Sequence, residues 1–212
     1  MRVLGVSGSL RRESHNRRLL RAAATLLPPV AELVPFEGLK AIPPFDEDDE
    51  AAPAPAVMRW RRSVAEADAL LFATPEYNSS IPGQLKNAID WASRPLATAA
   101  LRNKPAAVIG ASTGMFGAVW AQAELRKALA SAGARVIDRE LAIALADEAF
   151  DEQGMLVSPE QVLELGGILA ELVTEGTRHV RDERIALAAG GRISKPELSR
   201  QARPRAPCRR AS

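Results

Sequence analysis

The stretch MRVLGVSGSLRRESHNRRLLRAAATLL (residues 1–27) contains an apolar run, then a polar loop, then an amphipathic segment. Residues 2–6 form a short apolar run of the kind that predicts a buried strand, and residues 17–27 have the pattern of a helix. Gly8 and the polar residues after it separate the two. A strand, a loop and a helix in this order are the first unit of a parallel α/β sheet.

The same alternation continues to about residue 179. Further strands are expected at residues 31–35, 69–73, 106–111 and 134–138. Further helices are expected at residues 56–66, 83–93, 118–132 and 159–179. Five such units predict a doubly wound α/β fold with a five-stranded parallel sheet of order 2-1-3-4-5 and helices on both faces, although periodicity alone leaves the strand order open.

The composition is that of an ordinary globular protein, with 47% hydrophobic and 25% charged residues. No window approaches the roughly 18 apolar residues of a membrane span, and the N-terminus has no secretion signal. The one cysteine, Cys208, excludes a disulfide framework and a cysteine-based metal site. We therefore expect a cytoplasmic protein without a membrane segment and without a bound metal.

The positive charge is concentrated at the end of the chain. Residues 181–212 hold nine Lys and Arg against three acids, a net +6, so the rest, with 19 bases and 23 acids, carries −4. A nucleic-acid-binding surface is therefore not expected on the body of the protein. We predict one domain over residues 1–182 and a basic, Pro/Arg-rich, disordered and dispensable tail over residues 183–212.

The run PPFDEDDEAAPAP (residues 43–55) is acidic and rich in proline. Proline at these positions prevents a regular strand or helix, so we interpret the run as a surface loop. A cluster of carboxylates can also bind a metal, but this one lacks the spaced ligands and the glycine of a calcium loop.

The loop GSLRRESHN (residues 8–16) follows the first strand and leads into the first helix, which is where an open α/β sheet binds an anion. The side chains that can donate hydrogen bonds to a phosphate are Ser9, Ser14, Asn16 and Arg11 or Arg12. The alternative is that Ser14 or Asn16 only caps the helix while the arginines are solvated. His15 is interpreted as a solvated loop histidine, with a further donor to the phosphate as the alternative. Neither a Rossmann glycine motif nor a P-loop is present.

The block TPEYNSSIPGQLKNAIDW (residues 74–91) follows the third strand and runs into the third helix. Its prolines and glycine fix the turns, so Glu76, Tyr77 and Asn78 should lie at the carboxyl end of the sheet. An aromatic ring and free backbone amides there can contact a flat heterocycle. Tyr77 as a partly buried core residue is the alternative. Lys86 and Asp90 are one turn apart and fit a helix-surface ion pair.

The segment GASTGMFG (residues 110–117) follows the fourth strand and is a permissive loop at the same edge. On its own it is compatible with an ordinary tight turn. Its position next to the other two loops makes it a plausible third wall of the same site.

These three segments together resemble the NADPH-dependent FMN reductase family, including its chromate- and quinone-reducing members. The resemblance extends from the first strand through AFDEQGMLVSPEQV to about residue 180 and implies a flavodoxin-like fold. It implies that FMN phosphate is bound by Ser9, Arg11, Ser14 and Asn16. It implies that the flavin ring is bound by Pro75, Glu76, Tyr77 and Asn78, with Ser112 closing over it. Arg12 and Glu13 fall where the family varies, so no role is carried over to them, and the tail after about residue 185 has no counterpart.

The resemblance implies an enzyme that uses NADPH or NADH to reduce FMN and then passes electrons to a small acceptor in a ping-pong sequence. Quinones, free flavin, azo compounds and chromate are the expected acceptors. The cofactor carries the chemistry, so no dedicated catalytic residue is predicted. A flavodoxin-type electron carrier and an FMN-dependent sensor without NAD(P)H turnover are the alternatives.

Family members usually form dimers or tetramers, so a homodimer or homotetramer is expected. The third and fourth helices are the expected contact surfaces. Three tryptophans lie on expected helices, and each fits either the core or a subunit contact: Trp60, Trp91 and Trp120.

Overall fold

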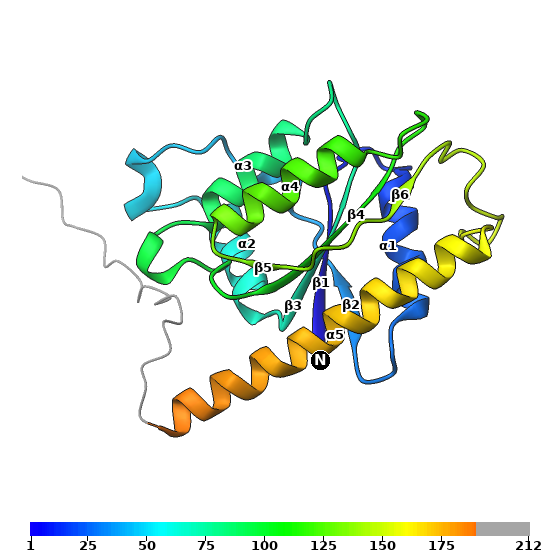
Figure 1. Ribbon diagram of the computed structural model, residues 1–212. Helices are drawn as coiled ribbons and strands as arrows, with labels where there is room; N and C mark the ends of the chain where they lie inside the picture. The colour runs from blue at the N-terminus through cyan, green and yellow to red at the C-terminus, as the bar shows by residue number, and fades with distance from the viewer. Residues whose placement is uncertain (190–212) are drawn as a thin grey trace, which may run out of the picture.

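The computed structural model describes residues 1–189 as three layers, with a parallel sheet between two layers of helices (Figure 1). The strands are β1 (Arg2–Ser7), β2 (Glu32–Pro35), β3 (Ala69–Thr74), β4 (Pro105–Ala111), β5 (Arg135–Val136) and β6 (Ala142–Ile143). The helices are α1 (His15–Leu26), α2 (Pro55–Glu66), α3 (Gly83–Ala92), α4 (Val119–Ser131) and α5 (Pro159–Ala188). Helices α1 and α5 cover one face, and α2, α3 and α4 cover the other.

The sheet order is β2-β1-β3-β4-β5, and all of its pairings are parallel. This confirms the predicted order 2-1-3-4-5. The register brings Ser7 of β1 beside Ala73 of β3, and Thr74 of β3 beside Gly110 of β4. The loops that follow these three strands therefore leave the sheet side by side at its carboxyl edge.

A sixth strand was not predicted. The expected strand at residues 134–138 is reduced to two residues, β5, which pairs with the start of β4. The chain then leaves the sheet through the exposed charges of Asp138, Arg139 and Glu140, and it returns as β6, which pairs with the end of β4. The apolar run LAIALA (residues 141–146) carries this second contact, with Leu141 and Ile143 buried.

Strands β3 and β4 are buried along their whole length. Parallel strands with helices on both faces lose contact with water on both sides, which explains their continuous apolar sequences. One core lies under α2, α3 and α4 and includes Leu4 and Phe72, and the other lies under α1 and α5 and includes Val3 and Leu71.

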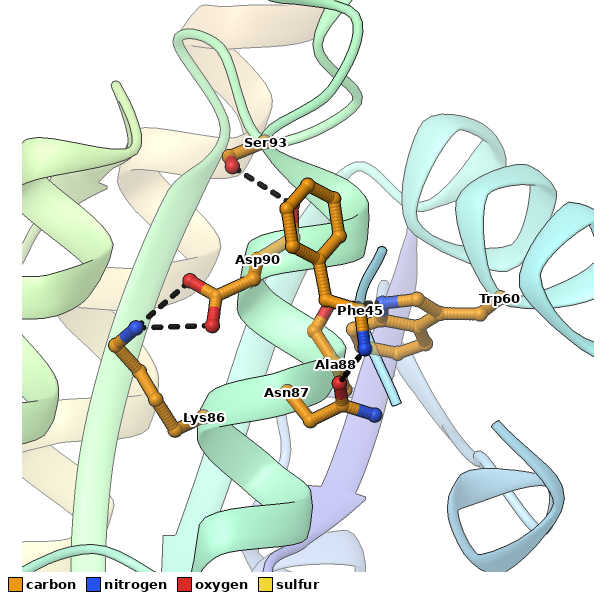
Figure 2. A network of polar contacts seen from close by, with 7 residues as sticks. All are labelled: Phe45, Trp60, Lys86, Asn87, Ala88, Asp90 and Ser93. Carbon is orange, nitrogen blue, oxygen red and sulfur yellow. Dashed lines mark hydrogen bonds and ion pairs between the residues drawn. The ribbon is translucent and has the colours of Figure 1, made fainter. Parts of the chain in front are cut away.

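Helix α3 is fixed to its neighbours by polar contacts to backbone groups (Figure 2). The Nε1 of Trp60 donates to the carbonyl of Ala88 at 2.6 Å. The side chain of Asn87 accepts from the N–H of Phe45 at 2.6 Å and donates to the carbonyl of Pro43 at 2.8 Å. The acidic loop of residues 43–55 is thus anchored at its start, although a short 3-10 helix, Asp48–Ala51, interrupts it.

The three tryptophans have different environments. Trp60 and Trp91 are fully buried in the core under α2, α3 and α4, whereas Trp120 is 46% exposed. Lys86 and Asp90 form the expected exposed ion pair along α3, with 2.7 Å between Nζ and Oδ1.

The last helix is longer than predicted. Helix α5 begins at a Ser158 cap, as the SPEQ sequence indicates, but it ends at Ala188 rather than at residue 179. Residues 183–188, which we assigned to the tail, are helical, and the orange end of α5 extends away from the sheet (Figure 1). The predicted disorder of residues 190–212 lies outside the described residues. No helix within residues 1–189 is long and apolar enough to cross a membrane.

Candidate functional site

The first loop joins β1 to α1 and carries the predicted phosphate ligands. Ser9 and Ser14 are buried, whereas Arg11 is exposed. Ser14 is the N-cap of α1, and its Oγ accepts from the N–H of Asn16 at 3.2 Å. The Oγ of Ser9 accepts from the N–H of Arg11 at 3.3 Å. The loop therefore places two hydroxyls and an arginine at the positive end of a helix dipole, where an anion is favoured.

Asn16 has a second set of contacts that the sequence did not indicate. Its side chain is 2% exposed and clamps the backbone of Ala111, at the end of β4. Asn16 Nδ2 donates to the carbonyl of Ala111 at 2.8 Å, and Oδ1 accepts from the N–H of Ala111 at 3.0 Å. The clamp ties the start of α1 to the start of the third loop.

His15 is not solvated, in contrast to our expectation. Its side chain is only 12% exposed, and its Nε2 lies 3.2 Å from Oδ1 of Asp147. The ring also stacks on Phe150, with 6.4 Å between ring centroids. His15 therefore packs the first helix against the segment after β6, and no sequence signal connected these residues.

The second loop contains a tight reversal. Tyr77 and Ser80 exchange two backbone hydrogen bonds of 3.0 and 3.1 Å. Asn78 and Ser79 between them have φ of 52° and 59°, as in a type I′ turn. The turn holds Tyr77 outward, 52% exposed, so Tyr77 is not a core aromatic. Pro75 at the base of the loop is buried.

The first and second loops touch because Gly8 has no side chain. A Cβ on Gly8 would lie 2.9 Å from Leu85 Cδ2 and 3.3 Å from Pro75 Cδ. A larger residue would have to displace the end of the Leu85 side chain on α3 and would press on Pro75. Gly8 therefore allows the close approach of the two loops that are expected to share a ligand.

Glu76 connects the second loop to the start of α4. Its Oε2 accepts from the N–H groups of Trp120 and Ala121, each at 3.1 Å. The N-cap of α4 is Ala118, whose side chain cannot cap, so Glu76 supplies the missing acceptor at the positive end of this helix. Only Oε1 is left for contact with a ligand.

The third loop carries Ser112 beside this junction. Ser112 is half-buried, and its Oγ accepts from the N–H of Gly114 at 3.2 Å. The hydroxyl hydrogen stays available for donation. The backbone of Ser112 is held by β6 and the segment after it, through hydrogen bonds to Ile143 and Ala146.

Large apolar side chains are exposed in these loops, at the start of α4 and in the segment after β6 that contacts the third loop. The exposed members are Leu10, Tyr77, Met115, Phe116, Trp120 and Leu145. Phe116 and Trp120 pack edge to face, with 4.9 Å between ring centroids. Exposed apolar groups gathered at one edge mark a surface for a ligand or a protein. Together with the first loop, they suit a ligand with a phosphate at one end and a flat ring at the other.

Metal ligands do not gather at this edge. Within residues 1–189 no group of three or more His, Cys, Asp and Glu side chains is placed to hold a metal ion. The donors at the site are hydroxyls, amides and a guanidinium, which suit an organic phosphate.

Comparison with known proteins agrees with this chemistry. The family model for NADPH-dependent FMN reductase matches residues 1–148. An NAD(P)H-dependent FMN reductase of Pseudomonas aeruginosa is 46% identical over 159 residues, which cover 74% of this chain and 85% of that protein. A 2-hydroxy-1,4-benzoquinone reductase of a Burkholderia species is 36% identical over 161 residues, covering 76% and 87%.

The fold is also similar to that of a flavoenzyme of known structure. The flavoenzyme FerB of Paracoccus denitrificans, an NAD(P)H:(acceptor) oxidoreductase, superimposes with a TM-score of 0.74 at 33% identity and covers 84% of this chain and 98% of its own. The family match over most of the chain, the relatives and the shared fold confirm the resemblance found in the three loops: the chain belongs to the NADPH-dependent FMN reductase family.

Proposed function

We propose that this chain binds FMN at the three loops and uses it to pass electrons from NADPH or NADH to small acceptors such as quinones. One observation carries the proposal. The phosphate-type donors of the first loop lie at the same edge of the sheet as the exposed apolar side chains of the other loops. FMN needs both kinds of surface, because its phosphate is a dianion and its ring is flat and largely apolar.

The phosphate end is assigned to Ser9, Arg11 and Ser14. The two hydroxyls are buried and fixed, and Arg11 supplies the charge. Asn16 acts on this site as a positioning residue, because both polar atoms of its side chain already bind Ala111.

The ring end is assigned to Pro75, Tyr77, Asn78 and Ser112. The tight turn presents Tyr77 and the backbone amides after it, and the Ser112 hydroxyl can donate to the opposite edge of a ring. Glu76 acts mainly by holding the second loop against the start of α4, because its carboxylate caps that helix.

Bound FMN would supply the redox chemistry, accepting a hydride from the nicotinamide and passing electrons to an acceptor in a ping-pong order. The protein must hold each substrate against the ring at about 3–3.5 Å. Tyr77, Phe116 and Trp120 offer flat apolar surfaces that hold such a substrate and exclude water. Quinones, free flavin, azo compounds and chromate are the proposed acceptors.

The proposed active form is a homodimer or homotetramer. A groove of about 790 Å³ runs between α3 and α4, and its walls carry charges of both signs, with Lys86, Asp90, Glu124 and Lys127 among them. Such a surface can pair with itself about a two-fold axis. Trp91 is fully buried, so it cannot contact a second subunit. Trp120 is 46% exposed, so it can. A monomeric mass by light scattering, at concentrations where FMN stays bound, would refute the oligomer.

The cytoplasm is the proposed compartment. A chain with one cysteine needs no oxidising environment for its stability. The reduced nicotinamides that the reaction consumes are intracellular donors.

The test is the flavin absorbance of the purified protein, followed by steady-state oxidation of NADPH and NADH with a quinone. We expect a yellow protein that oxidises at least one nicotinamide only when the quinone is present. FMN binding without turnover of either nicotinamide would match an electron carrier or a sensor, and it would refute the reductase function.

A further inference from the structure

A second pocket lies against the first loop. It has a volume of about 360 Å³ and is enclosed by α1, the second halves of β1 and β2, and residues 36–40. Ser7 and Ser9 form part of its wall, and Ser7 Oγ donates to the carbonyl of Ser9 at 3.3 Å. The pocket therefore shares a wall with the loop assigned to the FMN phosphate.

The floor of this pocket is apolar. Leu20 of α1, Leu33 of β2 and Phe36 line it. Gly5 lets the Leu33 side chain pack directly over β1, because a Cβ at this position would lie only 2.7 Å from Leu33 Cδ2. A flat apolar group of a ligand can lie between α1 and the edge of the sheet.

The rim of the pocket is cationic. Arg17 and Arg21 project from α1 and Lys40 from the segment after β2, against a single carboxylate, Glu37. Glu37 pairs with Arg17, with 3.1 Å between Oε2 and Nη1. The pair leaves Arg17 Nε buried and without a hydrogen-bond partner among the residues that the structure describes.

The chemistry of the pocket matches one end of the nicotinamide donor. We infer that it binds the adenosine 2′-phosphate end of NADPH and so selects NADPH over NADH; this rests on the proposed function. The floor receives the adenine, and the three cations receive the 2′-phosphate, which NADH lacks. In other dinucleotide sites an arginine near the end of the second strand accommodates the 2′-phosphate, whereas an acid there bonds the 2′-hydroxyl of NAD. Here Glu37 is paired with Arg17, which leaves Arg21 and Lys40 without a carboxylate partner in the pocket lining.

The volume of the pocket is large enough for one part of NADPH but not for the whole dinucleotide. Ligand pockets for small molecules measure about 300–1,000 Å³. At about 360 Å³ this pocket fits a nucleoside phosphate. The shared wall at Ser9 leaves the rest of the donor to extend toward the loops that hold the flavin.

Direct binding tests this without turnover. Calorimetry on the FMN-loaded protein compares adenosine 2′,5′-bisphosphate with ADP, which carries no 2′-phosphate. We expect the bisphosphate to bind at least tenfold tighter. The double variant Arg21→Ala/Lys40→Ala should lose about tenfold to a hundredfold in affinity for it. Arg18→Ala on the same helix, outside the pocket lining, is the matched control and should bind like the wild type.

Kinetics give the second measurement. In the double variant we expect kcat/KM for NADPH to fall by the same factor, with kcat/KM for NADH, kcat at saturation and FMN affinity unchanged. Equal binding of bisphosphate and ADP, or bisphosphate binding that the double variant retains, would overturn the pocket assignment even if quinone reduction is normal. Bisphosphate binding that the variant abolishes, in a protein that oxidises neither nicotinamide, would refute the reductase function and leave the pocket as a 2′-phosphoadenosine site.

Discussion

Replacing Asn16 by Ala should weaken both the fold and FMN binding. The substitution removes two hydrogen bonds, of 2.8 and 3.0 Å, to a backbone position that is itself buried. Each bond is worth about 1 kcal/mol net, and the N–H and C=O groups of Ala111 left without partners add a desolvation cost of similar size. We expect a loss of about 3 kcal/mol, which lowers Tm by roughly 6–12 °C in a chain of this length.

The matched control is Asn87→Ala. Asn87 also clamps two backbone groups, Phe45 N–H and Pro43 C=O, but it does so from α3 rather than from the phosphate loop. Its bond to Phe45 is drawn in Figure 2. Asn87→Ala should lower Tm and leave FMN affinity unchanged. Asn16→Ala should in addition weaken FMN binding by about tenfold, because the first loop loses its tie to β4.

Fluorescence titration with FMN, at a temperature where both variants are folded, measures this difference. If Asn16→Ala binds FMN as well as Asn87→Ala does, Asn16 holds the fold but does not position the phosphate loop. If Asn16→Ala melts like the wild type, the two hydrogen bonds do not carry the stability assigned to them.

Four further predictions concern three single residues and the end of the chain. Arg11→Ala should weaken FMN binding about tenfold by titration, and Arg12→Ala should not. Glu76→Ala should cost about 1 kcal/mol in thermal unfolding, whereas Glu76→Gln keeps an acceptor for the α4 N–H groups and should cost less than half as much. Burial, and then the charge of Lys104, lower the pKa of His179, so as the pH falls below about 6.5 the unfolded chain binds a proton that the folded chain does not. His179 should then contribute a fall in stability of at most about 1.4 kcal/mol per pH unit, so melts of the wild type should show a steeper loss than melts of His179→Gln. Removing residues 190–212 should leave NADPH-quinone turnover within about twofold of the full chain, because basic, proline-rich segments bury little apolar surface; a folded, FMN-loaded truncation without turnover would show that these residues reach an active site.

The long strands and the helix starts could be predicted because each leaves a local pattern. Strands β3 and β4 are apolar throughout because both faces are covered, and Ser158 followed by Pro159 marks a helix start. Strand β6 could not be predicted, because two residues leave no periodicity and the charges at residues 138–140 suggest that the sheet has ended. The end of α5 was missed because Ile185 and Leu187 are exposed and do not continue the apolar face.

The roles of polar residues in the loops were harder to predict than the positions of the loops. Asn16 and Ala111 are 95 positions apart, and Glu76 contacts α4 from 44 and 45 positions away. No local pattern signals such a pair. A polar side chain next to a cofactor loop looks the same in the sequence whether it faces the ligand or the backbone of another loop.

These long-range contacts connect the three loops to one another. Asn16 joins the first loop to the end of β4, Glu76 joins the second loop to the start of α4, and Gly8 allows the first and second loops to touch. Each loop is thereby held in place by at least one other before the cofactor binds. Binding therefore orders the loops only a little further, and less of the binding free energy is offset by the entropy cost of ordering them. Stability and FMN affinity should consequently fall together when one of these joining contacts is removed, whereas removal of an outward-facing donor such as Arg11 should reduce affinity alone.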